Sequence, residues 1–241
     1  MVNITIIGDS LALSRINDRI KYQDTYYYKL SKEFNAFVLN ASVRGNSSSN
    51  IIKKEYLDEY INSFVENDFI IIHVGIVDCS PRLMNKIEKK IIQCLISIPI
   101  ISIFIKTYIK IKSKNRFLFT KIFKKSEVSI DEFKLNMNKF VDIITEVNKN
   151  LKQVIIINIA SPNNYIKSRS AYIEQNIQEY NSILKQIADK NKNKNISIID
   201  IYSYSKINNE VLLDDGQHIN KKGHDFIFNE IKKIIKEKID A

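Results

Sequence analysis

The chain has 241 residues, a formal net charge of +10, three prolines and five glycines. This length fits one α/β domain with a full hydrophobic core, and so few prolines and glycines leave little room for flexible linkers. Cys79 and Cys94 have no CxxC spacing and no histidines at ligand spacing, which argues against a zinc site and favours reduced thiols. Because the first residues lack the pattern of a signal peptide, we expect a cytoplasmic protein.

The first predicted element is a buried strand, Val2 to Ile7, that stops at Gly8. Its β-branched residues are typical of a parallel strand. Asp9 and Ser10 follow directly, so the strand ends in Gly-Asp-Ser. Open α/β folds place their ligands at the carboxyl edge of the sheet, where this hydroxyl would lie. Ser10 is therefore the candidate nucleophile.

Strand and helix patterns alternate along most of the chain. A capping-box pattern at Ser129 and Glu132 opens one of the helices. His73 ends an apolar strand, and we expect a core or strand-end histidine there. The economical assembly is a parallel sheet of about five strands with helices on both faces. We expect strands at 2–7, 36–40, 69–74, 154–159 and 196–201, and helices at 24–34, 51–64, 130–148, 171–191 and 220–239.

Residues 82–128 break this alternation and form a predicted helical insert in a single domain that spans 1–241. An apolar run, Ile91 to Ile105, is interrupted by Pro99 and is shorter than the about 20 residues that a membrane span needs. Residues 82–125 hold twelve basic residues against one acid, Glu88, so this segment carries +11 and the rest of the chain −1. The basic residues are Arg82, Lys86, Lys89, Lys90, Lys106, Lys110, Lys112, Lys114, Arg116, Lys121, Lys124 and Lys125.

Three interpretations of the insert remain open. It is a helical cap with a solvated basic face, a peripheral element on an anionic membrane, or a binding surface for an anionic polymer such as an acidic glycan. Nucleic acid is the least favoured partner, because the lysines alternate with Ile and Phe and no recognised binding motif is present. The insert follows the third strand and would emerge near the site as a lid or cleft wall. Tyr108, Phe117 and Phe119 would line that wall or belong to the core.

Near the other end of the chain, Asp215 and His218 precede the last predicted helix. A nucleophilic serine needs a base that takes its proton and a group that orients the base. Three residues apart on a turn, Asp215 and His218 are suited to supply both. Each motif is weak evidence when taken singly. Together, at the first strand and the last loop, they predict a Ser-His-Asp triad.

With a GDS block after the first strand and a DxxH block before the last helix, the sequence resembles the SGNH, or GDSL-like, hydrolase family over nearly its whole length. The resemblance implies a flavodoxin-like three-layer α/β/α sandwich. It puts Ser10, Asp215 and His218 in the catalytic roles. It also places Gly45, in the stretch NASVRGNSSSN, in the oxyanion hole beside the backbone of Ser10.

The family has a GxND block after the third strand, where this chain has Gly75-Ile76-Val77-Asp78. Val77 has no side-chain donor, and losing one oxyanion-hole donor costs about 100- to 1000-fold in turnover. The candidates to replace the missing donor are the backbone N–H groups alone, the side chain of Asn46 or the side chain of Arg82. The valine form looks like a variant subgroup, which we associate with bacterial surface-polysaccharide genes. We expect hydrogen-bonding structural roles for Asp9 and Asp78.

The resemblance implies a serine esterase or O-acyltransferase that acts on acyl esters, acetyl above all, of a carbohydrate or lipid-linked glycan. No cofactor or metal is expected, and no acetyl-CoA signature is present. Two alternatives stay open. One is a degenerate SGNH-fold protein that binds a glycan or partner without turnover. The other is a membrane-surface accessory protein whose basic insert is the working part, at the inner membrane face.

Overall fold

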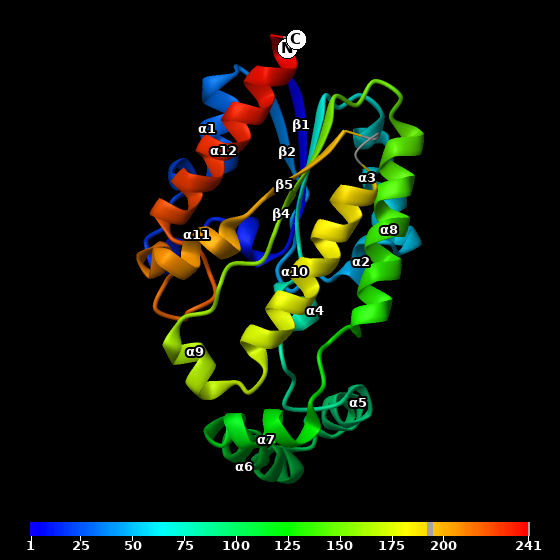
Figure 1. The fold of residues 1–241 in the computed structure, drawn as a ribbon. Coiled ribbons are helices and arrows are strands. Elements are labelled where there is room, and N and C mark those ends of the chain that lie inside the picture. The colour runs from blue at the N-terminus through cyan, green and yellow to red at the C-terminus, as the bar shows by residue number, and fades with distance from the viewer. Residues whose placement is uncertain (192–194, 241) are drawn as a thin grey trace.

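A computed structural model, which describes residues 1–191 and 195–240, has a five-stranded sheet at its centre (Figure 1). Every neighbouring pair of strands is parallel, in the order β2-β1-β3-β4-β5. This confirms the predicted α/β fold. The strands are β1 (Asn3–Gly8), β2 (Phe37–Asn40), β3 (Phe69–His73), β4 (Gln153–Ile157) and β5 (Ile196–Ile199).

Alternating side chains of each strand belong to two hydrophobic clusters, one on each face of the sheet. In β1, Ile4 and Ile6 pack with α1 (Tyr26–Glu33) and α12 (Lys221–Ile239), whereas Ile7 packs on the opposite face. That opposite face is covered by α3 (Lys54–Val65), α8 (Ile130–Val147) and α10 (Ile173–Lys190) (Figure 1). The predicted apolar stripe of α8 is buried throughout: Phe133, Met137, Phe140, Val141 and Ile144.

Of the predicted helices, one is interrupted and another begins two residues later than expected. The helix expected at 51–64 is divided into α2 (Ser48–Ile51) and α3, because Lys53 adopts an extended conformation between them. The helix expected at 171–191 begins only at Ile173, because Tyr172 has a φ of 64°, in the left-handed region that a helix cannot continue through. A short helix, α9 (Asn164–Arg169), precedes it.

Short elements that the hydrophobic pattern does not predict occupy the loops at the strand ends. They are α4 (Ile76–Cys79), α11 (Ile201–Ile207) and 3₁₀ turns at Ser10–Ala12, Ile16–Asp18, Tyr22–Asp24 and Asn209–Val211. Such elements are too short to show a period. His73 at the end of β3 is buried as predicted, and its burial lowers its pKa to about 3.

The insert forms three helices, α5 (Lys86–Leu95), α6 (Pro99–Lys114) and α7 (Arg116–Phe123). Pro99 starts α6, where its missing N–H costs no helical hydrogen bond. The three helices lie beyond the carboxyl ends of the strands, at the end of the molecule opposite both termini (Figure 1). Within the described residues, no helix is both long and apolar enough to cross a membrane.

A buried lysine lies at the centre of the insert. The Lys112 ammonium pairs with Glu88 at 2.5 Å and faces the rings of Tyr108, Phe119 and Phe123. Tyr108 and Phe117 are 42% and 45% exposed, so neither belongs to the core. Tyr108, Phe119 and Phe123 therefore surround a cation instead of extending the core of the sheet.

Candidate active site

Ser10, His218 and Asp215 form one hydrogen-bonded chain, although 208 positions separate the first two in the sequence. Ser10 Oγ lies 2.8 Å from His218 Nε2, and His218 Nδ1 lies 2.6 Å from Asp215 Oδ2. An ionised carboxylate can only accept a hydrogen bond, so Nδ1 carries the ring proton and Nε2 is left to accept from the serine. This tautomer suits a general base.

The end of β1 positions Ser10. Gly8 pairs with His73 in the sheet, and a Cβ on Gly8 would lie 2.6 Å from Ser42 Oγ and 2.8 Å from Ala12 Cβ, so only glycine fits. Asp9 caps the following 3₁₀ turn by accepting from the N–H of Leu11. After β1 the chain forms β2 on one side of it and then crosses back to form β3 on the other side, so Ser10 lies at the switch point of the sheet.

A tight turn before α12 positions the other two residues. Asp215 Oδ1 accepts from the N–H groups of Gln217 and His218, both at 3.0 Å, which leaves Oδ2 for the imidazole. Partial burial opposes ionisation, but the hydrogen bonds from His218 and Gln217 outweigh it and hold the pKa of Asp215 well below its usual range. Arg15, which no sequence pattern indicates, lies 3.7 Å from Oδ2. Asp215 therefore remains an anion that orients His218.

Gly216 lies inside this turn and packs against the N-cap of α9. Its φ is +76°, and a Cβ there would lie 2.1 Å from Asn163 Oδ1. Gly216→Ala is expected to shift the turn and lower turnover about 100-fold, because small displacements of a catalytic group have effects of this size. Steady-state kinetics with an aryl ester measure the change.

The matched control for Gly216→Ala is the double variant with Asn163→Ala, which removes the steric overlap. It should recover part of the activity, since only the cost of a non-glycine residue at positive φ, about 1–2 kcal/mol, and the lost cap remain. Full activity of Gly216→Ala alone would show that this packing does not position His218.

A pocket of about 540 Å³ opens beside the candidate oxyanion hole, and Gly45, Val77 and Arg82 are among its lining residues. The three triad residues do not line it. Gly45 has a φ of +73° with nothing within 4 Å of where a Cβ would lie, so its backbone faces open space. The pocket therefore adjoins Gly45 and Val77, the two positions at which the oxyanion hole was considered from the sequence.

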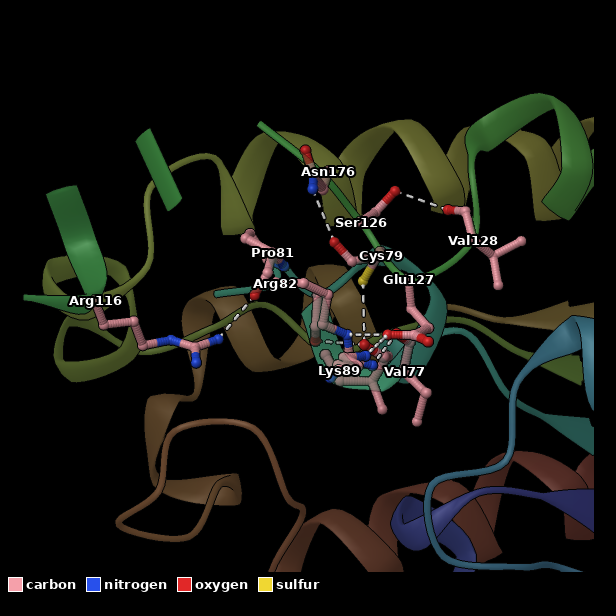
Figure 2. Close-up of polar contacts among 12 residues, drawn as sticks. Val77, Cys79, Pro81, Arg82, Lys89, Arg116, Ser126, Glu127, Val128 and Asn176 are labelled. Atoms are coloured by element: carbon pink, nitrogen blue, oxygen red, sulfur yellow. Dashed lines mark hydrogen bonds and ion pairs between the residues drawn. The ribbon is translucent and has the colours of Figure 1, made fainter. Parts of the chain in front are cut away.

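The two side chains predicted as substitutes for the missing asparagine are both engaged. Asn46 is buried and donates from Nδ2 to the Gly8 carbonyl at 3.3 Å. Arg82 donates to the Val77 carbonyl at 2.8 Å, and its Nε lies 2.9 Å from Glu127 (Figure 2). Asn46 is thus held at the backbone of Gly8, and Arg82 at the backbone of Val77.

Asp9 and Asp78 are two buried carboxyl groups beneath the site. Asp78 accepts from the N–H and the hydroxyl of Ser48, which ties the loop after Gly45 to α4. Within the described part of the chain, Oδ2 of each aspartate is buried without a hydrogen-bond partner. Burial raises the pKa of Asp9 to about 8 and that of Asp78 to about 6. The sequence shows these residues but not the burial that raises their pKa values.

Asp9 is expected to make the fold less stable as pH rises. The folded protein retains the Asp9 proton up to about pH 8, whereas the unfolded chain loses it near the ordinary value of 3.8. Between these values the folded state binds more protons, so the free energy of unfolding falls with increasing pH. Asp9→Asn resembles the protonated form and should flatten this slope in urea unfolding across that range. Asp58→Asn, an exposed position, is the control, and equal slopes for wild type and Asp9→Asn would contradict the assignment.

No group of three or more His, Cys, Asp or Glu side chains that could hold a metal ion occurs among the residues that the structure describes. Cys79 is buried and Cys94 is exposed, and both are free thiols.

Comparison with known proteins places this site in context. The model of the GDSL-like lipase/acylhydrolase family matches residues 4–231. No curated protein matches the chain. A lipase/acylhydrolase from Enterococcus faecalis is 16% identical with a TM-score of 0.63, covering 99% of this chain and 97% of its own.

Two further solved structures show the same likeness. A member of the lipolytic G-D-S-L family from Veillonella parvula is 14% identical with a TM-score of 0.63, covering 98% of this chain and 99% of its own. A carbohydrate esterase family 3 protein from Talaromyces cellulolyticus is 13% identical with a TM-score of 0.63, covering 100% of both chains. At these identities the structural likeness establishes the fold.

Proposed function

Because the chain belongs to the GDSL-like lipase/acylhydrolase family, we propose that it is a serine ester hydrolase in which Ser10, His218 and Asp215 form the triad. The hydrogen bond of 2.8 Å between Ser10 Oγ and His218 Nε2, continued by the one of 2.6 Å to Asp215, carries this proposal. These contacts join a hydroxyl, a base and an orienting anion in the order that acyl transfer requires.

The proposed reaction proceeds in two steps. As Ser10 Oγ attacks the ester carbonyl carbon, His218 Nε2 takes the hydroxyl proton and then gives it to the departing alcohol oxygen. This leaves an acyl-enzyme ester on Ser10. In the second step, a water molecule attacks that ester and loses a proton to His218, which protonates Ser10 as the acid leaves. A sugar hydroxyl in place of water would make the same protein an O-acyltransferase.

The oxyanion is proposed to bind the backbone N–H groups of Ser10 and Gly45. Asn46 and Arg82 are the candidates for a third donor. Asn46 Nδ2 has a second hydrogen besides the one directed at Gly8, and Arg82 is anchored on Val77, the residue that replaces the family asparagine. On this proposal, the valine form marks a variant subgroup whose third donor comes from outside the GxND block.

We propose acyl, and specifically acetyl, esters of a carbohydrate as the substrate class. Two observations support a polar substrate. The lining of the pocket beside Gly45 includes Ser49, Lys53 and Glu132, and one structural neighbour is described as a carbohydrate esterase. Lysines and hydroxyls are suited to the hydroxyl and carboxylate groups of a glycan.

Labelling of the purified protein by a fluorophosphonate probe, together with hydrolysis of a short-chain aryl acetate, tests the proposal. Labelling and turnover that both disappear in Ser10→Ala and His218→Ala would support an activated serine despite Val77. Acetylated sugars then test the substrate class, and an added sugar acceptor distinguishes transfer from hydrolysis.

Val77 also motivates a second candidate, a protein of this fold that binds a glycan without turnover. It predicts no labelling of a well-folded wild-type protein and unchanged glycan binding in Ser10→Ala. The intact hydrogen-bonded triad favours the enzyme over this alternative.

A further inference from the structure

The helices of the insert, α5–α7, have almost no interior. Among their described residues, only Ile105, Lys112 and Thr120 are buried. More than half of the large hydrophobic side chains that are exposed in the described chain belong to residues 87–123. Soluble monomers rarely expose contiguous apolar patches of more than about a few hundred Å² unless a partner binds there. The insert therefore has the properties of an interaction surface.

The exposed apolar side chains form stripes along the helices. On α6, Ile100, Ile103, Phe104 and Ile111 follow helical spacing and lie on one face, with Ile100 and Phe104 exposed by 72% and 71%. On α5, Ile87, Ile91 and Leu95 form a second stripe, and on α7, Leu118 and Ile122 form a third. Helices α5 and α7 both contact α6, so the three stripes belong to one small unit.

Lysines accompany these stripes. Those that are exposed on or beside the helices are Lys90, Lys106, Lys110, Lys114, Lys121, Lys124 and Lys125. The two acids of this region are already paired, since Glu88 binds Lys112 and Glu127 binds Arg82 and Lys89. The surface is thus apolar and cationic at once. A second copy of the chain would bring lysines against lysines, so charge complementarity favours an anionic occupant.

The connection between the insert and the catalytic domain is braced by polar contacts. Glu127, just before α8, binds both Arg82 and Lys89, and Arg116 donates to the Pro81 carbonyl at 2.9 Å (Figure 2). Because these contacts hold α5–α7 at the carboxyl end of the sheet, a surface that binds the insert would face the same end of the molecule as Ser10 (Figure 1).

We propose that α5–α7 dock the protein on an anionic lipid bilayer. The apolar stripes insert into the interface while the lysines bind the acidic headgroups, as in amphipathic helices that lie in the membrane plane. This proposal does not depend on the proposed esterase activity, because docking and ester hydrolysis use different residues.

Co-sedimentation of the full-length protein with phosphatidylcholine vesicles, with and without phosphatidylglycerol, tests the docking. We expect binding to the phosphatidylglycerol vesicles at low salt, and weaker binding at about 1 M salt, where the Debye length falls to about 3 Å. Protein that remains in the supernatant at low salt, or binds both vesicle types equally, would overturn the proposal. So would a protein that self-associates through this surface in sedimentation without lipid.

Two variants separate the contributions of charge and apolar contact. Replacing Lys106, Lys110, Lys114 and Lys121 by glutamine should weaken binding at least about 100-fold, since each contributes to attraction by an anionic surface. Ile103→Ser with Phe104→Ser should weaken it by a similar factor through lost apolar burial. The matched control removes four exposed lysines of α8 and α10: Lys134, Lys139, Lys185 and Lys190.

The control variant should bind vesicles like wild type. If it lost as much binding as the variant of the insert, binding would depend only on net charge, and the proposal of a defined docking surface would be wrong. All variants should keep the wild-type melting temperature and the wild-type hydrolysis of a water-soluble aryl ester. Failure of docking is thereby distinguishable from failure of the proposed catalytic function.

Discussion

Ser10→Ala is expected to lower kcat for a short-chain aryl acetate by about 10⁶-fold, as removal of a triad serine does in other hydrolases. Without the hydroxyl, no acyl-enzyme forms, and the base His218 has no proton to take. His218→Ala should cause a loss of similar size, because the two residues act as one unit, and the double variant should be little worse than either. Steady-state kinetics and fluorophosphonate labelling both measure the effect.

The control for Ser10→Ala is Ser182→Ala, an exposed serine of α10 whose hydroxyl donates to the Glu179 carbonyl. It should retain labelling and most of the turnover. Thermal unfolding should give nearly the same melting temperature for Ser10→Ala as for wild type, since Ser10 Oγ is only partly buried. Hydrolysis by Ser10→Ala at the wild-type rate would remove Ser10 from the mechanism.

Asp215→Asn should lower kcat by about 10⁴-fold while leaving KM nearly unchanged. The amide of asparagine can donate to Nδ1 of His218, which stabilises the tautomer with its proton on Nε2. That nitrogen then faces Ser10 with a hydrogen instead of a lone pair and cannot act as the base. The exposed neighbour Asp214→Asn is the matched control and should behave like wild type.

The pH profile of the wild-type enzyme gives an independent test of Asp215. Hydrogen bonds hold the pKa of Asp215 well below its usual range, so protonation of this carboxylate should not limit activity at any moderately acidic pH. The loss of activity at low pH should therefore titrate as a single group.

For Asp215→Asn, a fall in kcat of less than about tenfold would show that another residue orients His218.

Much of the fold follows from local patterns. The β-branched runs that become β1, β3 and β4 are long enough to identify as strands, and the stripe of α8 has a clear helical period. The break at Lys53 and the helix start after Tyr172 were not predicted, because single residues with extended or left-handed backbone leave the apolar spacing on either side unchanged. The short helices at the strand ends were missed for the same lack of period.

Some residues of the candidate site could likewise be predicted from the sequence, and others could not. Ser10, Asp215 and His218 were recognisable because each lies in a short motif beside a predictable element. Arg15 and Asn163 were not, since their contacts with the Asp215 turn join distant parts of the chain. The raised pKa values of Asp9 and Asp78 could not be predicted either, because burial causes them and burial is a property of the packed molecule.

By itself, the sequence determined the class of fold, the residues of the candidate triad and the concentration of positive charge in residues 82–125, since composition and short-range spacing encode all three. Only the tertiary structure decided that Ser10 and His218 meet at 2.8 Å and that Lys112 lies inside the insert while Ile100, Ile103 and Ile111 face outward. The physical reason is that a hydrophobic pattern predicts which face of a helix is apolar, but the packing of neighbouring elements determines whether that face is covered.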